Sequence, residues 1–365
     1  MDRVFVRTNL ACRPPWAVSW PLDWSCVSRT PGICRTCEGK IEDMEYLVAD
    51  WHDSRRSVVR KTVQRWTNAE HWRQRRLVSR GLDLPALPKA TASVWGISMV
   101  KNEADIIDSV VRHMLDQDID RILVVDNGST DGTYEMLKEL SKELPIFVGR
   151  DSEPGYYQAH KMTALASRAR RAGAEWVVPF DADEFWFAPG TTVGAYLRSS
   201  SVTRVQAAIH NAFPTAENPR LSGLEGELRL DVPPHLMRKV ASRTSPFLWI
   251  GMGNHTAMRS GSGLEDRLRI LHLPWRSQEQ LTRKVRQGAA AYAASSLKGV
   301  GGHWITQGAL SDDGLQEVWD RLLKGEGEAD LGWRPIGPFL VDRFDHWRTW
   351  DPDGQVPVLA SANKF

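Results

Sequence analysis

The 365-residue sequence contains no run of about 18 consecutive apolar residues, so it offers no candidate for a membrane-spanning helix. Its N-terminus also lacks the apolar core of a secretory signal. A formal net charge of only +2 indicates no polyanionic partner such as nucleic acid. We therefore expect a cytoplasmic protein, whose length and hydrophobic content of 42% suffice for one sizeable core with an appendage.

Cysteine is scarce and is confined to the first tenth of the chain, at Cys12, Cys26, Cys34 and Cys37. Cys34 and Cys37 form a CxxC pair, but the other two cysteines do not have the paired spacing of a zinc knuckle. A disulfide framework is not indicated either, because the large remainder of the chain has no cysteine. The pattern favours incidental thiols in an irregular segment.

Three motifs of common nucleotide-binding and hydrolytic folds are also missing. The sequence has no GxxxxGK[ST] loop, which argues against a P-loop nucleotidase. No GxGxxG follows the first predicted strand, so the dinucleotide-binding fingerprint is missing. There is no GxSxG elbow, which argues against an α/β-hydrolase.

Composition divides the chain into four parts. Residues 1–43 carry many Pro, Arg, Trp and Cys residues without a clear period, which predicts an irregular or disordered extension. Residues 44–88 are predicted to form a basic helical segment that ends in a Pro-containing linker. Residues 89–310 form the predicted main domain, and residues 311–365 form a predicted C-terminal helix and tail.

The segment 54–80 is strongly basic and contains a single acid, Glu70. Its cations are Arg55, Arg56, Arg60, Lys61, Arg65, Arg73, Arg75, Arg76 and Arg80. Val59, Val63 and Trp66 recur at helical spacing, which predicts a basic amphipathic helix. Such a helix can lie on the anionic inner face of a membrane, or it can dock on the main domain with a solvated basic face.

The main domain alternates strand and helix patterns. Short apolar runs predict buried strands, and apolar residues at spacings of three and four predict the helices between them. The predicted strands are 94–100, 121–126, 146–148 and 175–180, and the predicted helices are 104–117, one containing Tyr134, Leu137 and Leu140, and 156–173. This order predicts an α/β fold with a mostly parallel central sheet and helices on both faces.

Polar residues gather where three of these strands end, at residues 101–103 (KNE), 126–128 (DNG) and 181–184 (DADE). In an open parallel sheet, ligands bind at the carboxyl ends of the strands. Asp181 and Asp183 are crowded together, and their mutual repulsion favours a bound cation or a raised pKa. Because Mg²⁺ or Mn²⁺ typically combines one or two carboxylates with substrate phosphates, the pattern predicts a metal–diphosphate site.

Three segments resemble, in this order, motifs of glycosyltransferase family 2: ISMVKNE at 97–103, VVDNGSTDGT at 124–133 and EWVVPFDADEF at 175–185. The resemblance is strongest to a branch whose signature reads KNE … DNGSTDGT … DADEF. It covers about residues 93–290 and includes the later stretches at 253–255 and 271–277. The resemblance implies a GT-A fold, an inverting sugar transfer, a donor that is commonly UDP-linked, and a divalent metal.

The resemblance also implies roles for individual residues. Asp126 would contact the uridine, Asp181 would approach the ribose or the metal, and Asp183 would bind the metal, with His272 as a further metal or phosphate contact. The nucleotide-sugar pocket would be lined by Val100, Asn102, Glu103, Asp126, Asn127 and Asp181. Lys161, near the start of a predicted helix, either reaches the diphosphate or belongs to a solvated helix terminus.

Spacing does not fix the general base, for which Glu184 and Asp266 are the leading candidates and Glu225, Glu227 and His255 the others. Trp186, Trp275 and His255 are candidate contacts to the sugar or the acceptor. The alternatives are core packing for the two tryptophans and a structural hydrogen bond for the histidine.

The predicted acceptor is a hydroxyl of a glycan, a lipid-linked molecule or a protein. Two other functions remain open at this point. A sugar nucleotidyltransferase or metal-dependent phosphohydrolase also uses carboxylates and a divalent ion, but the nucleotidyltransferases carry a Gly-rich basic loop that residues 101–103 do not resemble. A non-catalytic carbohydrate-binding module would leave the acidic clusters at the strand ends unexplained.

Overall fold

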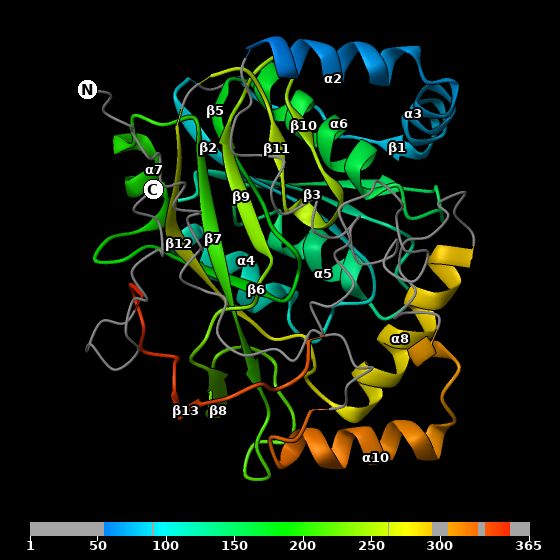
Figure 1. Cartoon of the computed structure of the whole chain (residues 1–365), viewed down its shortest axis with the longest axis vertical. Helices are drawn as coiled ribbons and strands as arrows, with labels where there is room; N and C mark the ends of the chain where they lie inside the picture. The colour runs from blue at the N-terminus through cyan, green and yellow to red at the C-terminus, as the bar shows by residue number, and fades with distance from the viewer. Residues whose placement is uncertain (1–54, 90, 262, 294–305, 328–332, 351–365) are drawn as a thin grey trace, which may run out of the picture. The chain divides into compact units, whose positions relative to one another are not determined.

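The computed structural model describes residues 55–350 apart from 90, 262, 294–305 and 328–332. The predicted extension 1–43, with its CxxC pair, lies outside the described residues, as does the end of the chain from residue 351. The described part of the chain is built around an 11-stranded sheet (Figure 1).

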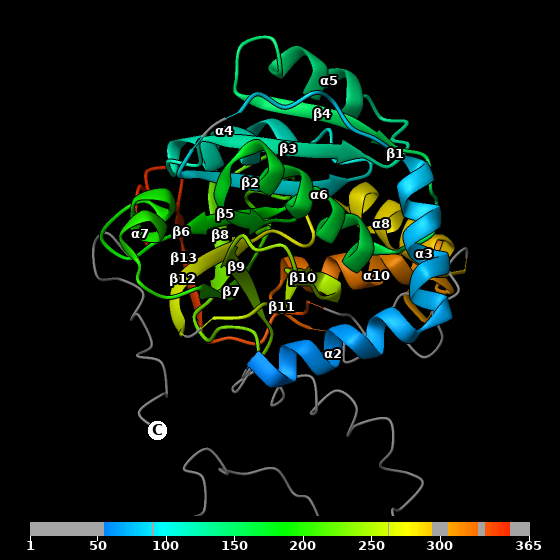
Figure 2. The same ribbon diagram turned by 90° about the horizontal axis from the view of Figure 1, so that it is seen from above.

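The first half of this sheet is parallel. It consists of β2 (Ser93–Val100), β3 (Arg121–Asp126), β4 (Ile146–Asp151) and β5 (Ala174–Pro179), in the spatial order β4-β3-β2-β5. These strands are nearly continuous apolar runs because both faces of the sheet are covered. The four strands predicted from the sequence are therefore confirmed, and their carboxyl ends lie along one edge (Figure 2).

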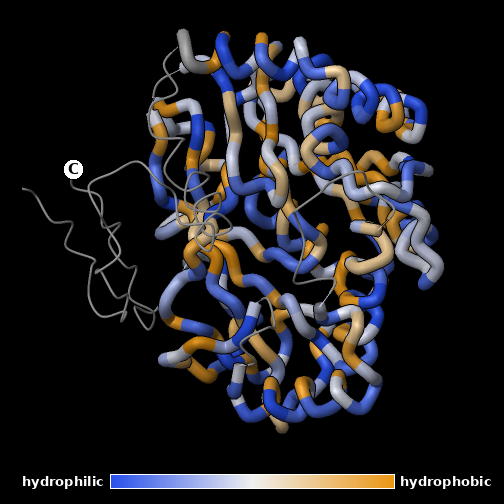
Figure 3. The backbone as a smooth tube through the Cα atoms, turned by 45° about the vertical axis from the view of Figure 1, so that its right-hand side comes forward, coloured by the Kyte–Doolittle hydropathy of each residue, from blue (hydrophilic) through white to orange (hydrophobic). Residues whose placement is uncertain are grey.

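Helices cover both faces of the parallel half, as predicted. On one face, α4 (Ile107–Asp116) and α5 (Thr133–Leu140) contribute apolar stripes to the larger core cluster. On the other face, α6 (Gln158–Ala172) packs its apolar residues against β2 and β5. Hydrophobic and hydrophilic residues alternate along the outer helices (Figure 3), so each helix buries one side and presents the other to solvent.

The second half of the sheet is mixed and was not resolved into strands by the sequence patterns. The order continues from β5 through β9 (Arg238–Arg243), β7 (Arg204–Phe213) and β12 (Leu264–His272) to β6 (Glu184–Phe187). β9 is antiparallel to β5 and β7, β12 is parallel to β7, and β6 is antiparallel to β12. The last of these pairings places His272 opposite Glu184, at the end of the acidic 181–184 segment.

Smaller elements complete this half. β7 also pairs with β8 (Glu227–Asp231), which pairs in turn with β13 (Phe339–Arg343). The C-terminal segment therefore adds a strand to the sheet, beyond the helix and tail predicted for it. α7 (Val193–Ser199) follows β6 and is capped by Thr192, whose hydroxyl accepts a hydrogen bond from the Ala195 N–H.

Two C-terminal helices pack together beside the main sheet. These are α8 (Gln278–Ala293) and α10 (Asp312–Leu323), and the second confirms the helix predicted in that region. The Ser311 hydroxyl caps α10 by accepting a hydrogen bond from the Gly314 N–H. Trp275 is buried in the hydrophobic cluster between these two helices.

The basic N-terminal segment is helical, as predicted, but it forms two helices. α2 (Arg55–Thr67) ends before Asn68, whose side chain caps the start of α3 (Ala69–Gly81) by accepting hydrogen bonds from two N–H groups. α3 packs on α6, and β1 (Leu82–Asp83) joins β4 before the linker at 84–88. No described helix is both long and apolar enough to cross a membrane.

Candidate active site

The loops after β2 and β3 are fastened to each other by hydrogen bonds. The Asn102 N–H donates to Ser129 Oγ at 2.9 Å, and the Asn102 side-chain oxygen accepts from the Thr130 N–H at 2.7 Å. The Glu103 N–H donates to Thr133 Oγ1 at 2.9 Å. Asn102 has φ +56°, a left-handed conformation that asparagine tolerates better than most residues. The two motifs therefore form one rigid rim at the carboxyl edge of the sheet.

Asp126, the last residue of β3, is 4% exposed. One carboxylate oxygen, Oδ2, accepts hydrogen bonds from the N–H groups of Gly128 and Ser129, both at 3.1 Å. The other, Oδ1, is buried and has no hydrogen-bond partner among the described residues. Because buried acceptors are nearly always paired, this oxygen is suited to a donor group of a ligand.

Lys161 occupies a buried ion pair that neither sequence interpretation anticipated. Its Nζ lies 2.6 Å from Asp151 Oδ2, and the two side chains are 1% and 0% exposed. Asn127 donates to the same Asp151 oxygen at 2.8 Å, and Lys161 also donates to the Glu153 carbonyl at 2.7 Å. Burial lowers the pKa of Lys161, against the opposing effect of Asp151. Lys161 therefore stabilises the loops that follow β3 and β4, and its ammonium group does not reach solvent.

Replacing Lys161 by Met is expected to destabilise the fold by about 3–5 kcal/mol, because it leaves the Asp151 carboxylate buried without its counter-ion. Urea unfolding measures the change in the free energy of unfolding. The matched control is Lys142→Met, which removes an ion pair with Glu139 whose side chains are 66% and 71% exposed. The control should cost less than about 1 kcal/mol. Equal losses in the two variants would contradict the assignment.

Asp181 follows β5 and is held by two partners from distant segments. Lys239 Nζ, from β9, lies 2.5 Å from Asp181 Oδ2. Asn254, from the short 3₁₀ turn η2 (Met252–Asn254), donates to Asp181 Oδ1 at 3.0 Å. The Asp181 side chain keeps 35% of its surface exposed, so it remains open to a ligand.

Asp183 is more deeply buried than Asp181 and lies beside two cations, Lys284 and Arg276, and beside His272. Lys284 Nζ lies 2.5 Å from Asp183 Oδ2, His272 Nε2 lies 3.6 Å away and Arg276 Nη1 3.8 Å away. Burial by itself would raise the pKa of Asp183, but Lys284 and the neighbouring cations outweigh it and hold that pKa well below its usual value. Asp183 is therefore ionised throughout the physiological pH range.

Arg276 links the KNE motif (residues 101–103) to the pair Asp181 and Asp183, which is called the DxD motif below. It is completely buried, and its Nε lies 2.8 Å from Asp105 Oδ2. Its Nη2 forms an ion pair with Glu103, and Nη1 lies 3.8 Å from Asp183 Oδ2. The sequence patterns predict no role for Arg276, although it lies in one of the stretches that resemble the family. Only the strand order of the folded sheet shows that one guanidinium group meets all three acids.

Glu184 lies beneath the DxD motif and points inward. It is 1% exposed, lies 2.9 Å from Lys239 Nζ, and accepts hydrogen bonds from the Trp186 indole N–H at 3.3 Å and the Asp181 N–H at 3.1 Å. Burial raises the pKa of Glu184 to about 7, although Lys239 opposes the shift. Its direct contacts support Lys239 and the backbone of the motif.

Asp266 does not join this cluster. It lies on β12, six residues before His272, which corresponds to about 20 Å along a strand. Its carboxylate faces Arg238 at 3.5 Å and Arg269 at 3.4 Å. The structure therefore separates this base candidate from the DxD motif.

The candidate acceptor contacts are buried as well. Trp186 and Trp275 are both 0% exposed, and the Trp275 indole N–H donates to the Trp333 carbonyl at 3.0 Å. Neither ring offers a face to a sugar, so core packing describes both. His255 shares a hydrogen bond of 2.8 Å with the Arg238 carbonyl, which is the structural alternative considered for it.

Buried histidines should make the free energy of unfolding depend on pH. Burial lowers the pKa to about 4 for five of them, namely His113, His160, His210, His235 and His255. An unfolded histidine titrates near 6.5, so the unfolded state binds more protons between pH 6.5 and 4. The free energy of unfolding should therefore keep its full value above pH 6.5, and it should fall by on the order of several kcal/mol toward pH 4. Urea titrations across this range test it, and a flat profile would contradict it.

The side chains around His272 have the chemistry of a metal site. If the Asn211 side-chain oxygen, 2.9 Å from His272 Nδ1, accepts the ring proton, then Nε2 presents its lone pair toward Asp183 Oδ2. Two acceptors facing each other at 3.6 Å suit a cation between them. Among the described residues, no group of three or more His, Cys, Asp and Glu side chains is already arranged to hold a metal ion. Two protein ligands leave the other positions to a substrate diphosphate and water.

Comparison with known families identifies the region that contains these motifs. Residues 97–190 match the family Glycosyl transferase family 2. This region is similar to glycosyltransferase family 2. The match spans β2 through β6 and therefore includes the KNE, DNGSTDGT and DADEF motifs. The match marks the chain as a glycosyltransferase, and the predicted α/β fold is confirmed by the strand order described above. A search of curated proteins finds no match.

Several solved glycosyltransferases are distantly similar to this chain. S. aureus TarS 1-349 in complex with UDP is 13% identical, with 60% of this chain and 70% of that chain covered and a TM-score of 0.34. TarS 1-349 in complex with UDP-GlcNAc is 14% identical at the same coverage and TM-score. The mannosyltransferase PcManGT from Pyrobaculum calidifontis, in complex with GDP-Man and Mn²⁺, is 16% identical over 73% of this chain and 84% of that chain, with a TM-score of 0.34.

Proposed function

We propose that this glycosyltransferase moves a sugar from a UDP-linked donor to an acceptor hydroxyl in the cytoplasm, with inversion and with Mn²⁺ or Mg²⁺. The acceptor would be a glycan, a lipid-linked molecule or a protein. The observation that carries the proposal is the convergence of acids from the ends of β2, β3 and β5 at one sheet edge, where cationic side chains surround Asp183.

The unpaired oxygen of Asp126 supports a nucleotide role for the first half of the site. A uracil ring carries one imide N–H, which is a donor that a buried carboxylate oxygen can accept. Val100, Asn102 and Glu103 border the same edge, because β2 and β3 are adjacent and their loops are hydrogen-bonded to each other. We assign the base of the donor to this position.

Asp126→Asn should weaken UDP binding by about 10- to 100-fold, because the asparagine side chain has only one acceptor oxygen. Either the backbone N–H groups that Asp126 now binds or the uracil N–H would then lack an acceptor. Calorimetric titration with UDP measures the affinity. Asp108→Asn on α4 is the control, since that acid is exposed and pairs only with Arg112. Unchanged affinity in Asp126→Asn would remove this residue from the nucleotide site.

Asp183 and His272 are the residues we propose to hold the metal, with Asp181 beside them. A bound divalent cation would neutralise the charge that develops on the leaving diphosphate. Lys284 contacts Asp183 and is 21% exposed. It can therefore turn from the carboxylate to a phosphate oxygen when the donor enters. Lys239 and Glu184 keep Asp181 in place.

Of the two base candidates, Glu184 is the one that adjoins the DxD motif. A pKa of about 7 suits a base that works at neutral pH. Its burial against Lys239 suits a positioning role instead. The pH–rate profile of Glu184→Gln separates the two roles. Loss of a low-pH limb near pH 7 assigns the base, whereas a lower rate at every pH with the limb retained assigns positioning.

Product analysis tests the proposed reaction. The full-length protein is incubated with Mn²⁺ and individual nucleotide sugars, and the released products are separated by ion-exchange chromatography. Release of UDP, or transfer of the sugar to an added acceptor, is the expected result. Release of pyrophosphate would indicate nucleotidyl transfer, and no turnover with any nucleotide sugar would contradict the proposal.

A further inference from the structure

A cavity of about 800 Å³ lies away from the acidic cluster, between the N-terminal helices and the catalytic domain. Its walls come from α2, α3, the outer side of α6 and residues 245–249. None of the strand-end residues of the proposed active site lines it. In Figure 2, α2 and α3 lie along the side of the molecule next to α6, β10 (Trp249–Ile250) and β11 (Ala257–Met258). The cavity is thus separate from the proposed active site. Its α6 wall lies inside the family match, whereas its walls from α2, α3 and residues 245–249 lie outside that match.

The cavity is lined by arginines that have no counter-ion among the described residues. Arg65, Arg75, Arg168 and Arg171 all line it, and none of them forms an ion pair with a described carboxylate. The Arg65 guanidinium instead stacks over the Trp249 ring at 4.0 Å. One acid, Asp83, lines the cavity. Four uncompensated arginines around one space favour an anionic ligand, since guanidinium groups bind phosphate through several donors.

Polar atoms without partners gather at the same cavity. Four buried atoms have no hydrogen-bond partner in the described part of the chain, and all four residues line the cavity: Thr62 Oγ1, His71 Nε2, Arg168 Nε and Ser245 Oγ. His71 is 8% exposed and is fixed through Nδ1, which lies 3.0 Å from His160 Nε2. Each unsatisfied buried group costs about 1–3 kcal/mol, so four around one space indicate a ligand that supplies acceptors and donors.

The mouth of the cavity carries exposed apolar side chains. Trp66 and Phe247, which both line the cavity, are 50% and 56% exposed, and Trp72 beside them is 42% exposed. The Trp66 ring lies 6.5 Å from that of Trp72 and 6.4 Å from that of Phe247. Val59 and Val63 extend the patch along α2 with more than half of their surface exposed. Aromatic and aliphatic side chains next to arginines are typical of surfaces that enter the membrane interface.

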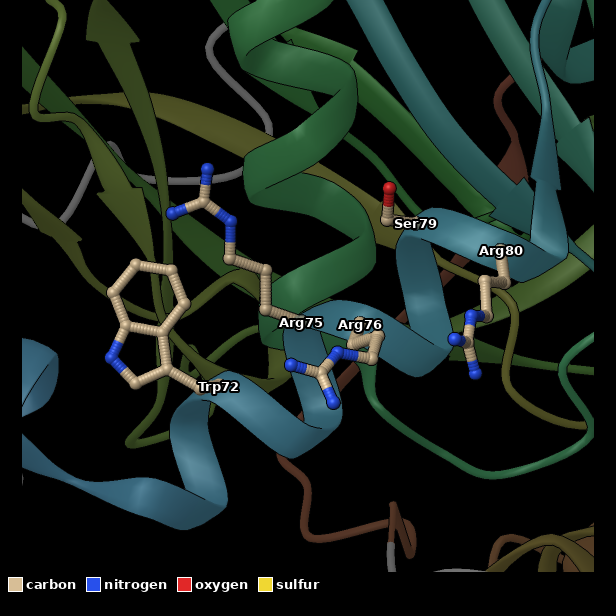
Figure 4. A pocket seen from close by; sticks show the side chains of 5 residues that line it. All are labelled: Trp72, Arg75, Arg76, Ser79 and Arg80. Carbon is tan, nitrogen blue, oxygen red and sulfur yellow. The ribbon is translucent and has the colours of Figure 1, made fainter.

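A second, smaller hollow lies on α3 next to the patch. Figure 4 shows the adjacent Arg75 and Arg76, and Arg80 from the next turn of the helix, with Trp72 and Ser79 beside them. Its volume is about 340 Å³, and Arg75 stacks on the Trp72 ring at 5.1 Å. The positive surface therefore continues beyond the cavity, as a surface facing many phosphate groups requires.

We propose that α2, α3 and residues 245–249 form a docking surface for an anionic phospholipid membrane, with a lipid phosphate bound in the cavity. Trp66, Trp72 and Phe247 enter the interface, and the cavity arginines and His71 contact the phosphate. A short stretch of chain separates this surface from the proposed active site, since β10 is followed by the turn that contains Asn254, which donates a hydrogen bond to Asp181. This surface would hold the enzyme against a bilayer, and its existence does not depend on which sugar is transferred.

Vesicle co-sedimentation of the full-length protein tests the proposal. The vesicles contain phosphatidylcholine alone or phosphatidylcholine with phosphatidylglycerol. Binding is expected only with phosphatidylglycerol and should weaken as salt increases. Arg65→Gln/Arg75→Gln should bind about 25-fold more weakly, since each arginine near an anionic surface contributes roughly fivefold. The matched control, Arg112→Gln/Arg343→Gln, removes two exposed arginines that already pair with acids, and it should bind like the wild type.

Trp66→Ser/Phe247→Ser tests the apolar part without changing charge, and it should weaken vesicle binding at every salt concentration. Retained UDP binding in each variant shows that the enzyme is folded, so a failure of docking is distinguishable from a failure of the proposed reaction. Equal binding to both vesicle types, or an equal loss in the control, would overturn the proposal. So would stabilisation by inorganic phosphate without vesicle binding, which would indicate a soluble anion, or retention by duplex DNA instead of vesicles.

Discussion

Asp183→Asn is expected to lower the rate of sugar transfer by about a thousandfold or more, because it removes charge from the one carboxylate placed between Lys284 and His272. The amide has the same shape, so packing around it should be retained. The measurement is UDP release under saturating donor and Mn²⁺.

The control for this prediction is Asp108→Asn, which neutralises an exposed acid on α4 and should leave the rate unchanged. A rescue experiment sharpens the result. If Asp183 binds the metal, the variant should require a much higher Mn²⁺ concentration for its residual activity. A variant that turns over normally at the wild-type Mn²⁺ concentration would show that Asp183 is not part of the metal site.

Arg276→Met is expected to destabilise the protein by about 3–5 kcal/mol and to abolish measurable transfer, because Glu103, Asp105 and Asp183 would share a buried region without their common cation. Burial already raises the pKa of Glu103 even with Arg276 in place. The free energy of unfolding from urea titration and the rate of UDP release measure the two effects.

The double variant Arg276→Met/Asp105→Asn distinguishes charge from packing. Neutralising Asp105 should recover part of the lost stability if uncompensated negative charge is the cause, since residues of one network are not additive. Arg112→Met, at an exposed pair on α4, should cost less than about 1 kcal/mol. A double variant that is less stable than Arg276→Met alone would contradict the electrostatic explanation.

The parallel half of the fold could be predicted because its local patterns agree with its tertiary environment. β3 and β5 each contain a run of consecutive apolar residues, ILVV and WVVP, and α4 has apolar residues at helical spacing. The second half could not be predicted in this way. β9 reads RKVASR and β7 reads RVQAAIHNAF, and both contain polar residues that are buried only because partner strands and side chains satisfy them.

The same distinction explains what was found of the candidate site. Asp126, Asp181 and Asp183 could be identified because each follows a recognisable strand, and strand ends converge in a parallel sheet. Lys239 and Asn254 could not, because they meet Asp181 from 58 and 73 residues away in sequence. The burial of individual side chains could not be predicted from the sequence either. Trp186 is of a residue type that often stacks on sugars, but its side chain is buried in the core.

Calorimetric titration of the full-length protein with UDP, in the presence of Mn²⁺ and after its removal with a chelator, tests the central claim most directly. That claim is that acids at the carboxyl edge of the sheet hold a cation and, through it, a diphosphate. The account predicts UDP binding that weakens greatly without Mn²⁺, and a much smaller effect of Mn²⁺ in Asp183→Asn. UDP binding of equal affinity with and without the metal, in both proteins, would contradict it.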